Sequence, residues 1–333
     1  MSAERVKKSA SSTLAYQLVM ERLKLVEQEI VRASHSEVAL VRRLAEYLHH
    51  AGGKRLRPAM VLLSAQACGY EGEDDIELGA IVEFIHTATL VHDDILDEAQ
   101  TRRGHAAANQ IWGNQVAVLL GDYIYIRSMA MSVGLGDLRI VQVLADATSR
   151  LVEGEILDVS HTGDASMTKE IYIDILDRKT ASLFAACSQA GAMLAGAPRQ
   201  IEEGLVSYAW NLGMAFQLVD DCLDYAADPE SLGKQTGTDL REGKVTLPVI
   251  YLLERAEGDA REHALSCLGN AELTAESLTR VVADMQKHGC LEDSLREALD
   301  YSRMAQGGLA GLPESPAKEA LAELPDFVIA RQH

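Results

Sequence analysis

Apolar residues recur along most of the chain three to four positions apart, which is the spacing of one face of an α-helix. This spacing extends over residues 14–30, 58–67, 76–96, 115–133, 140–159, 169–195, 201–225 and 246–255, with weaker stretches toward the C-terminus. The period of a β-strand is rare, and no proline lies between Pro58 and Pro198 to interrupt a helix. The pattern predicts an all-α fold, a large helical bundle whose functional residues face an interior cavity.

Glycine-rich and polar breakers separate the predicted helices at 52–53, 69–75, 134–137, 162–168, 196–199 and 228–243. The last of these is the longest, and long loops in compact domains are often lids or binding segments. Length alone favours two domains, because 333 residues exceed the usual size of one hydrophobic core. Since no shift in composition marks a boundary, we expect residues 1–333 to form one domain.

The composition of the chain excludes several classes of function. The formal net charge of −19 argues against nucleic-acid binding, which needs a basic surface, and against general adhesion to anionic lipids. An anionic substrate must therefore be held by local basic clusters or by metal ions. The five cysteines form no C-x-x-C pair, the N-terminus has no signal-peptide pattern, and charged residues interrupt the apolar stretches too often for a membrane span. We expect a soluble, cytoplasmic protein.

Two Asp-Asp-x-x-Asp clusters, DDILD at 93–97 and DDCLD at 220–224, end two of the apolar helical runs. Residues four apart lie on one helix face, so Asp93 and Asp97 project together. Like charges one turn apart destabilise a helix without a counter-charge, and carboxylates with room for water and phosphate oxygens suit Mg²⁺. One such cluster is as typical of a solvated helix end as of a metal site. Two with the same spacing and apolar flanks favour metals that bridge a diphosphate.

Basic residues stand beside these clusters, against the acidic trend of the chain. The segment GGKRLRP at 52–58 places three cations before a predicted helix N-terminus, and together these make an anion site. Arg102 and Arg103 follow the first cluster, and guanidinium groups bind phosphate oxygens bidentately. The remaining candidates are Lys179 and Thr180 within a helix, Gln217 one turn before Asp221, Lys234 in the long loop and Lys244 beyond it. Each alone is more typical of a solvated surface, but their concentration beside the aspartates favours function.

Five elements in a fixed order carry a family resemblance: GGKRLRP, EFIHTATLVHDDILDEAQTRRG, the pair Lys179-Thr180, LGMAFQLVDDCLDY and GKQTGTDLREGKVTLP. On these, from about Gly52 to Pro248, the chain resembles the trans-type polyprenyl diphosphate synthases, the family of farnesyl, geranylgeranyl and octaprenyl diphosphate synthases. The C-terminal third carries no comparable motif. The resemblance implies an all-α bundle around a deep central cavity, usually a homodimer, whose substrates are isopentenyl diphosphate and an allylic diphosphate.

The resemblance also implies roles for individual residues. Isopentenyl diphosphate would be held by Lys54, Arg57, His86 and Arg103, and the allylic diphosphate would be contacted by Arg102, Lys179, Lys234 and Lys244. Mg²⁺, about two or three ions per site, would be ligated by Asp93, Asp97 and Asp220, with Asp94, Asp221 and Asp224 in support. Thr180 and Gln217 would stabilise the allylic carbocation once diphosphate leaves. No dedicated protein base is apparent, so we expect the released diphosphate to take the proton.

The helix that leads to Asp93 is expected to set product length. In short-chain relatives bulky aromatic residues four and five places before the first aspartate close the cavity, whereas here Thr89 and Ala88 hold these places. Ile85, Phe84 and Ile81 would line a deeper tunnel, and the helix at 115–133, with Met129 and Met131, would supply its floor. We predict a product of roughly eight or nine isoprene units (about C40–C45), made from farnesyl diphosphate for a quinone side chain. The alternative is that Ala88 is only a close helix contact.

Four other interpretations stay open. A short-chain farnesyl or geranylgeranyl diphosphate synthase is the nearest, and residue size at Ala88 argues against it. A terpene cyclase shares one aspartate cluster but needs no isopentenyl site, so the 52–58 loop and Arg103 argue against it. A non-catalytic subunit typically loses aspartates, and all six are present. A metal-dependent phosphohydrolase dyad at His92 and Asp93 needs further histidines in register, where the sequence supplies aspartates.

Overall fold

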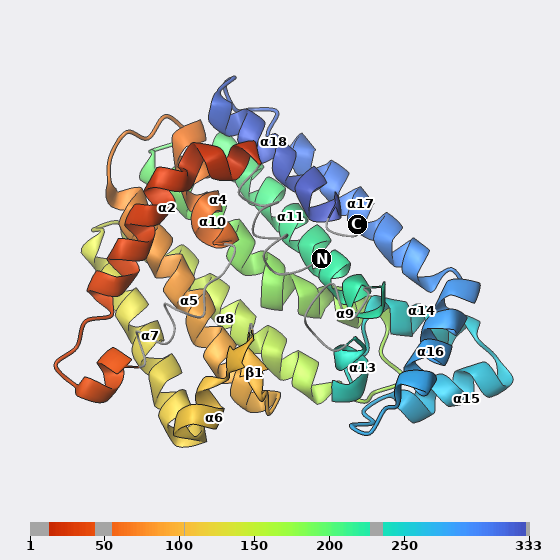
Figure 1. Cartoon of the computed structure of the whole chain (residues 1–333). Helices are drawn as coiled ribbons and strands as arrows, with labels where there is room; N and C mark the ends of the chain where they lie inside the picture. The colour runs from red at the N-terminus through yellow and green to blue at the C-terminus, as the bar shows by residue number, and fades with distance from the viewer. Residues whose placement is uncertain (1–12, 44–54, 103, 227–235, 331–333) are drawn as a thin grey trace.

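The computed structural model describes residues 13–43, 55–102, 104–226 and 236–330. Nearly all of its elements are helices, with a single two-stranded hairpin (Figure 1). In chain order they are α2 (Leu14–Ala33), α4 (Leu56–Ala67), α5 (Asp74–Leu96), β1 (Thr101–Arg102), β2 (His105–Ala106), α6 (Ala108–Trp112), α7 (Asn114–Gly134), α8 (Leu138–Ser160), α9 (Lys169–Leu176), η1 (Asp177–Ala181), α10 (Ser182–Leu194), α11 (Arg199–Ala226), α13 (Thr238–Glu242), α14 (Leu247–Arg255), α15 (Gly258–Cys267), α16 (Ala275–Lys287), α17 (Cys290–Gly307) and α18 (Pro316–Ile329). The predicted all-α fold is confirmed.

Local sequence explains where several helices begin. Asp137, Thr168 and Ser315 each precede a helix, and their side-chain oxygens accept hydrogen bonds from backbone N–H groups of the first turn. These bonds satisfy donors that have no partner within the helix. Pro248 and Pro316 stand in first turns, where the missing N–H costs nothing.

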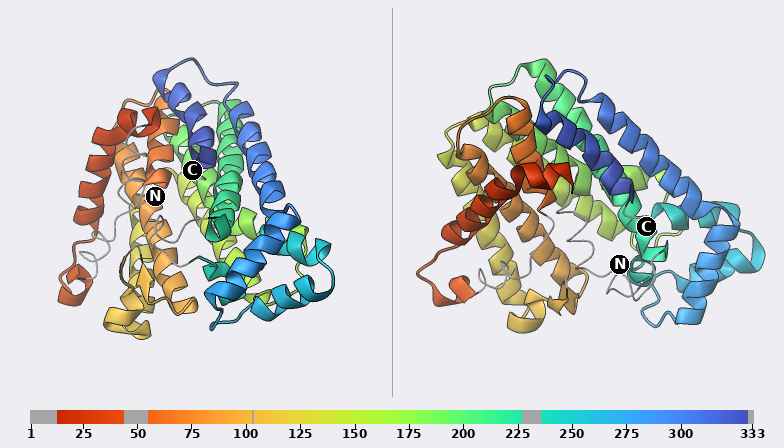
Figure 2. Two further views of the ribbon diagram at one scale, coloured as in Figure 1. Left: turned by 45° about the vertical axis from the view of Figure 1, so that its right-hand side comes forward. Right: turned by 45° about the horizontal axis from the view of Figure 1, so that its top comes forward.

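The long helices pack around a continuous apolar core. Helix α10 lies against α4, α8 and α11, while α5 runs beside α7 and α17 runs beside α11 (Figure 2). Fully buried side chains from different helices meet between them, among them Met60, Ile81, Leu144, Phe184 and Tyr208. Burial of each such side chain stabilises the fold by about 1.5–3 kcal/mol, which fixes the helices that carry polar residues at one end of the bundle.

Two expected elements differ from the structure. The helix predicted over 169–195 is interrupted at 177–181 by a π-helical turn, in which each backbone hydrogen bond spans five residues instead of four. The loop predicted over 228–243 contains the short helix α13 in its second half. Both differences arise from contacts with neighbouring helices and not from the helix propensity of the segments themselves.

Helix α7 is the one helix in the described part of the chain that is long and apolar enough to cross a membrane. It is packed along α5, and only some of its residues are buried in the core. A single helix of this kind is weak evidence for a membrane span, since core helices of helical bundles have the same length and composition.

Candidate active site

The first aspartate cluster stands at the C-terminal end of α5. Asp93 is half-buried, and Asp97 is exposed at the helix end. Asp94 points elsewhere: it is buried, and its carboxylate accepts a hydrogen bond from Nε of Arg102 on β1 at 2.6 Å. The β1–β2 hairpin, which sequence patterning did not predict, therefore holds Arg102 against the cluster.

Asp93 faces acidic neighbours as well as a lysine. Burial and then repulsion from Glu155 on α8 raise its pKa to about 8, although Lys179 counteracts both. Asp97 also contributes repulsion, as the four-residue spacing predicted. The carboxylate thus lies in a region where acidic neighbours outnumber the one lysine, so a divalent cation would be attracted.

Lys179 connects the first cluster to α8. Its Nζ lies 2.8 Å from both Glu155 Oε2 and Asp158 Oδ2. Burial lowers the pKa of Lys179, but Asp158, Glu155 and Asp93 outweigh burial, so the pKa is raised and the amine stays charged. Glu155 and Asp158 were not among the residues predicted from sequence. Their spacing of three on a predicted helix was the available signal, since it places both on one face.

The π-helical turn η1 carries both Lys179 and Thr180. Two neighbouring helices approach its backbone closely through glycines. A Cβ on Gly154 of α8 would come within 2.8 Å of the Lys179 nitrogen, and a Cβ on Gly213 of α11 would come within 2.8 Å of the Ala181 Cα. Trp210 Nε1 also donates a hydrogen bond to Asp177 Oδ1 at 2.6 Å, at the start of the turn. The widened turn therefore fits a space that these two helices leave open.

The second cluster stands near the end of α11. Asp221 is buried, and each of its carboxylate oxygens accepts a hydrogen bond: Oδ1 from Gln217 Nε2 at 2.7 Å and Oδ2 from Tyr172 Oη at 2.6 Å. Burial raises the pKa of Asp221 to about 7 even though the hydrogen bonds from Tyr172 and Gln217 lower it. Gln217 also accepts a hydrogen bond from Thr180, with 3.0 Å between Thr180 Oγ1 and Gln217 Oε1, a contact that the sequence did not predict.

Asp224 caps the short helix α13. Its oxygens accept hydrogen bonds from the backbone N–H groups of Thr238 and Asp239 at 3.1 and 3.0 Å. This explains why α13 forms within the expected loop, because a carboxylate at a helix N-terminus satisfies its free donors and favours its dipole. Asp239, also not predicted, lies beside it, and burial followed by repulsion from Asp224 raises its pKa.

Lys244, just after α13, links the first cluster to the segment that Asp224 of the second cluster caps. Its Nζ lies 3.4 Å from Asp97 of the first cluster and 2.7 Å from Glu242. Burial lowers the pKa of Lys244, but Asp97, Glu242 and Asp239 outweigh burial and raise it. The ends of α5 and α11 therefore meet at one end of the bundle, near β1 and α13 (Figure 1).

The cations of the basic segment at 52–58, which runs into the first turn of α4, lie in two different environments. Arg55 forms ion pairs with Glu27 and Glu83, so one of the three cations of this segment has a structural role. Arg57 instead lies over the ring of Phe184, with its guanidinium carbon 4.9 Å from the ring centroid. His86 is half-buried on α5, one turn above Thr89 and Leu90. Three predicted residues, Lys54, Arg103 and Lys234, lie outside the described residues.

His92 turns away from the aspartates. Its Nε2 lies 3.2 Å from the Val118 carbonyl oxygen and 3.6 Å from Asp122, both on α7. Gly121 makes this possible, since a Cβ there would come within 2.2 Å of the imidazole. This geometry gives no support to a hydrolase dyad of His92 with Asp93.

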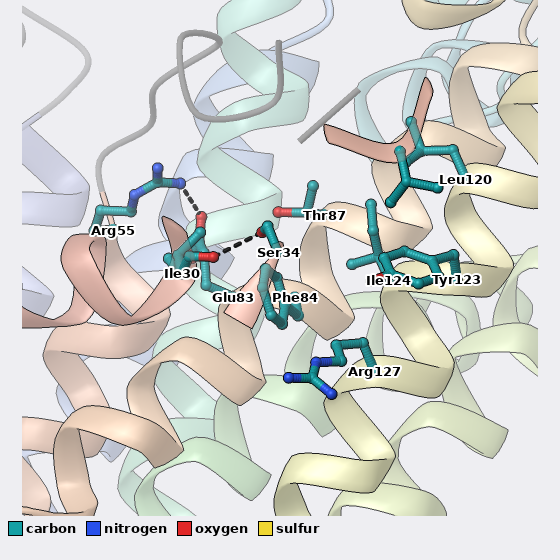
Figure 3. Close-up of a pocket in the computed structure, with 11 residues that line it drawn as sticks. Ile30, Ser34, Arg55, Glu83, Phe84, Thr87, Leu120, Tyr123, Ile124 and Arg127 are labelled. Atoms are coloured by element: carbon teal, nitrogen blue, oxygen red, sulfur yellow. Dashed lines mark hydrogen bonds and ion pairs between the residues drawn. The ribbon is translucent and has the colours of Figure 1, made fainter. Parts of the chain in front are cut away.

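A small pocket, partly open to solvent, lies along α5 one turn or more before the aspartates (Figure 3). Phe84 and Thr87 of α5 face Leu120, Tyr123 and Ile124 of α7 across it. Arg127 and the Arg55–Glu83 ion pair add polar groups to its wall. The α7 residues that line it are thus nearer the start of the helix than Met129 and Met131, which were expected at the floor.

Residues 38–285 match the family model described as polyprenyl synthetase. The chain belongs to the polyprenyl synthetase family. It is 40% identical to the octaprenyl diphosphate synthase of Escherichia coli over 308 residues (92% of this chain and 94% of that protein). It is 38% identical to a short chain isoprenyl diphosphate synthase of Methanothermobacter thermautotrophicus over 323 residues (95% and 98%).

A solved structure shows the same fold. The polyprenyl synthase of Caulobacter crescentus, crystallised with calcium and isoprenyl diphosphate, superposes with a TM-score of 0.91 at 39% identity, covering 96% of this chain and 98% of that chain. The all-α isoprenoid synthase fold is therefore confirmed, and this polyprenyl synthetase is a prenyltransferase of a metal-dependent family.

Proposed function

We propose that this polyprenyl synthetase is a long-chain trans-polyprenyl diphosphate synthase, which condenses isopentenyl diphosphate stepwise onto an allylic diphosphate, with farnesyl diphosphate as the primer. The observation that carries the proposal is that the aspartate clusters at the ends of α5 and α11 lie at one end of the bundle with two half-buried, charged lysines beside them, Lys179 paired with Asp158 and Lys244 near Asp97. The product is roughly C40–C45 and serves as a quinone side chain.

The donors around the clusters fit Mg²⁺. They are carboxylates, which hard divalent cations prefer, and they stand on separate helices, as suits a cation that also binds diphosphate oxygens. Within the described part of the chain no three such side chains form a ready-made metal group. Asp93, Asp97 and Asp220 would be the ligands, with Asp94 and Asp224 in support through Arg102 and α13. A bound cation there stabilises negative charge on the departing diphosphate.

The chain's own residues perform the remaining work. Lys179 and Lys244, released from Asp158 and Glu242, contact the allylic diphosphate together with Arg102 and Lys234. Arg57, His86, Lys54 and Arg103 hold isopentenyl diphosphate. Thr180 and Gln217 present oxygen atoms to the allylic cation, and their mutual hydrogen bond orients both. Positioning two substrates in this way removes much of the entropic barrier.

The cavity between α5 and α7 receives the distal part of the growing chain. Ala88 and Thr89 lie on α5 between it and Asp93, and both are small. An isoprenoid tail that passes them reaches apolar side chains at Phe84, Leu120 and Ile124. The 40% identity to an octaprenyl diphosphate synthase supports a long product, while the short-chain relative supports the alternative of a farnesyl or geranylgeranyl diphosphate synthase.

The protein is proposed to act as a cytoplasmic homodimer of single-domain subunits. Large apolar side chains are exposed at heptad spacing on α7 (Leu119, Ile126 and Val133) and on one side of α8 (Val152, Ile156 and Val159). A contiguous exposed apolar surface of this kind marks an interface between proteins. The lipid product gives the enzyme a reason to approach membranes without spanning them.

The test is product analysis. With farnesyl diphosphate, labelled isopentenyl diphosphate and Mg²⁺, we expect dephosphorylated products of about eight or nine isoprene units. Chelation of the metal should abolish extension, and Asp93→Asn should lower kcat by about 100-fold or more. Asp146→Asn is the matched control. Asp146 is an exposed carboxylate on α8, outside both clusters, so this variant should retain full activity. Products of three or four units would favour the short-chain alternative, and no extension would overturn the proposal.

A further inference from the structure

Four side chains from α9, η1 and α11 form an unbroken line of hydrogen bonds behind the site. Tyr172 on α9 donates to Asp221, Gln217 donates to the other oxygen of Asp221, and Thr180 donates to Gln217. The three distances are 2.6, 2.7 and 3.0 Å. The line therefore begins at a tyrosine to which the proposed function gives no role, and it ends at two residues proposed to face the allylic cation.

The direction of each bond is fixed by chemistry. Tyr172 is almost fully buried, and burial followed by the Asp221 charge raises its pKa well above the usual value, so its hydroxyl keeps the proton. The Gln217 amide presents its NH₂ group to Asp221 Oδ1, and Asp221 Oδ2 accepts from the Tyr172 hydroxyl. The amide oxygen of Gln217 is then directed toward Thr180.

The orientation has a consequence for the site. A flipped Gln217 would place an NH₂ group, with its positive hydrogens, where an oxygen now stands beside Thr180. Beside a carbocation an oxygen dipole stabilises and an amide N–H repels. Gln217 forms only one hydrogen bond to Asp221, so this bond alone does not fix the carboxylate. The second hydrogen bond, from Tyr172, holds the carboxylate where it accepts from the NH₂ group of Gln217 and leaves the amide oxygen facing Thr180.

We propose that Tyr172 is a positioning residue for prenyl transfer, which acts through Asp221 to hold the Gln217 oxygen and the Thr180 hydroxyl toward the allylic cation. The inference rests on the proposed function of Gln217 and Thr180. Asp221 is correspondingly an orienting group, whose two oxygens are both engaged by protein donors. This role differs from that of Asp220 in the same cluster.

Tyr172→Phe removes the hydroxyl and keeps the ring. We expect kcat to fall by about 10-fold or more, with KM for isopentenyl diphosphate within about twofold, because the substrate contacts are untouched. The matched control is Tyr208→Phe, a fully buried tyrosine whose hydroxyl donates to the Leu321 carbonyl at 2.7 Å. That variant should lose an equivalent buried hydrogen bond and keep kcat within about twofold.

A second readout is independent of how much enzyme is folded. In single turnovers with both substrates and Mg²⁺, the ratio of allylic alcohol to condensed product reports how well the cation is protected. Tyr172→Phe should raise this ratio and Tyr208→Phe should not. Equal ratios or equal kcat losses in the two variants would overturn the inference.

A double-mutant cycle separates the inference from the function on which it rests. If Tyr172 acts through Gln217, adding Tyr172→Phe to Gln217→Met should lower kcat by less than about twofold further. Multiplicative losses would show an independent effect and overturn the inference alone. If Gln217→Met itself keeps the wild-type kcat, the proposed function of Gln217 fails and the inference falls with it.

Discussion

Gly154 and Gly213 are the residues that bring two helices against the backbone of the π-helical turn. Neither stands at a positive φ, so conformational freedom is not the reason for them. The reason is distance, since a Cβ on either would meet backbone atoms at 2.8 Å, which a flexible side chain cannot relieve. The absence of a Cβ at these two glycines therefore determines the position of the turn that carries Lys179 and Thr180.

Gly213→Ala should move the turn and with it Thr180. Overpacking of this kind destabilises a fold by about 1–3 kcal/mol, and we expect kcat to fall by about 10-fold or more as well. The measurements are chemical denaturation and steady-state kinetics. Gly134→Ala is the control, because nothing lies within 4 Å of a Cβ at that helical position. Equal stability and activity in both variants would contradict the packing argument.

Helix α5 combines two tasks along one length. Its last turn carries Asp93 and Asp97, and its middle carries Phe84 and Thr87, which line the cavity shared with α7. The rise of 1.5 Å per residue ties these tasks together, because the distance from the reacting diphosphate to each wall position is fixed by its place in the sequence. Under the proposed function, α5 would therefore set the length of the product chain.

 Ala88→Phe adds an aromatic ring at a buried position five residues before Asp93. The added volume should close the passage from the diphosphates to the cavity, so the main product should shorten by several isoprene units. Sizing of the dephosphorylated products checks this. Leu90→Phe adds the same ring on another side of α5 and should leave the product distribution unchanged. An unchanged distribution in Ala88→Phe would mean that Ala88 is only a close helix contact.

At the scale of the whole molecule, the acidic charge and the apolar surface act in different places. The net charge of −19 opposes non-specific association, yet the outer sides of α7 and α8 expose large apolar side chains. Leu119 and Ile126 are 67% and 65% exposed and stand seven residues apart, which places them on one face of α7. A second copy of the chain would bury this face at little electrostatic cost.

The double variant Leu119→Glu with Ile126→Glu should dissociate the proposed dimer, because each charge would have to be buried without a partner. Sedimentation or light scattering should then give the mass of one chain in place of two. Met304→Glu, an exposed apolar residue on α17, is the control and should keep the dimer mass. A wild-type protein that already has the mass of one chain would refute the homodimer.

The sequence by itself determined the helices and the two aspartate clusters, because both depend on spacing within one segment. Helical periodicity reports which face is buried, and an i, i+4 pair of aspartates reports a shared face. Through the family resemblance it also predicted roles for Thr180 and Gln217, which the structure brings within hydrogen-bond distance of each other. The partners Tyr172, Glu155, Asp158 and Asp239 were not predicted.

Only the tertiary structure decided those partners. Glu155 and Asp158 reach Lys179 from another helix, and Asp224 selects α13 from a segment that reads as a loop. Hydrogen bonds and charge interactions depend on distances of a few ångströms between segments far apart in the chain, and packing of the core sets those distances. Local spacing therefore placed the chemical groups on their helices, and helix packing determined which of them act together.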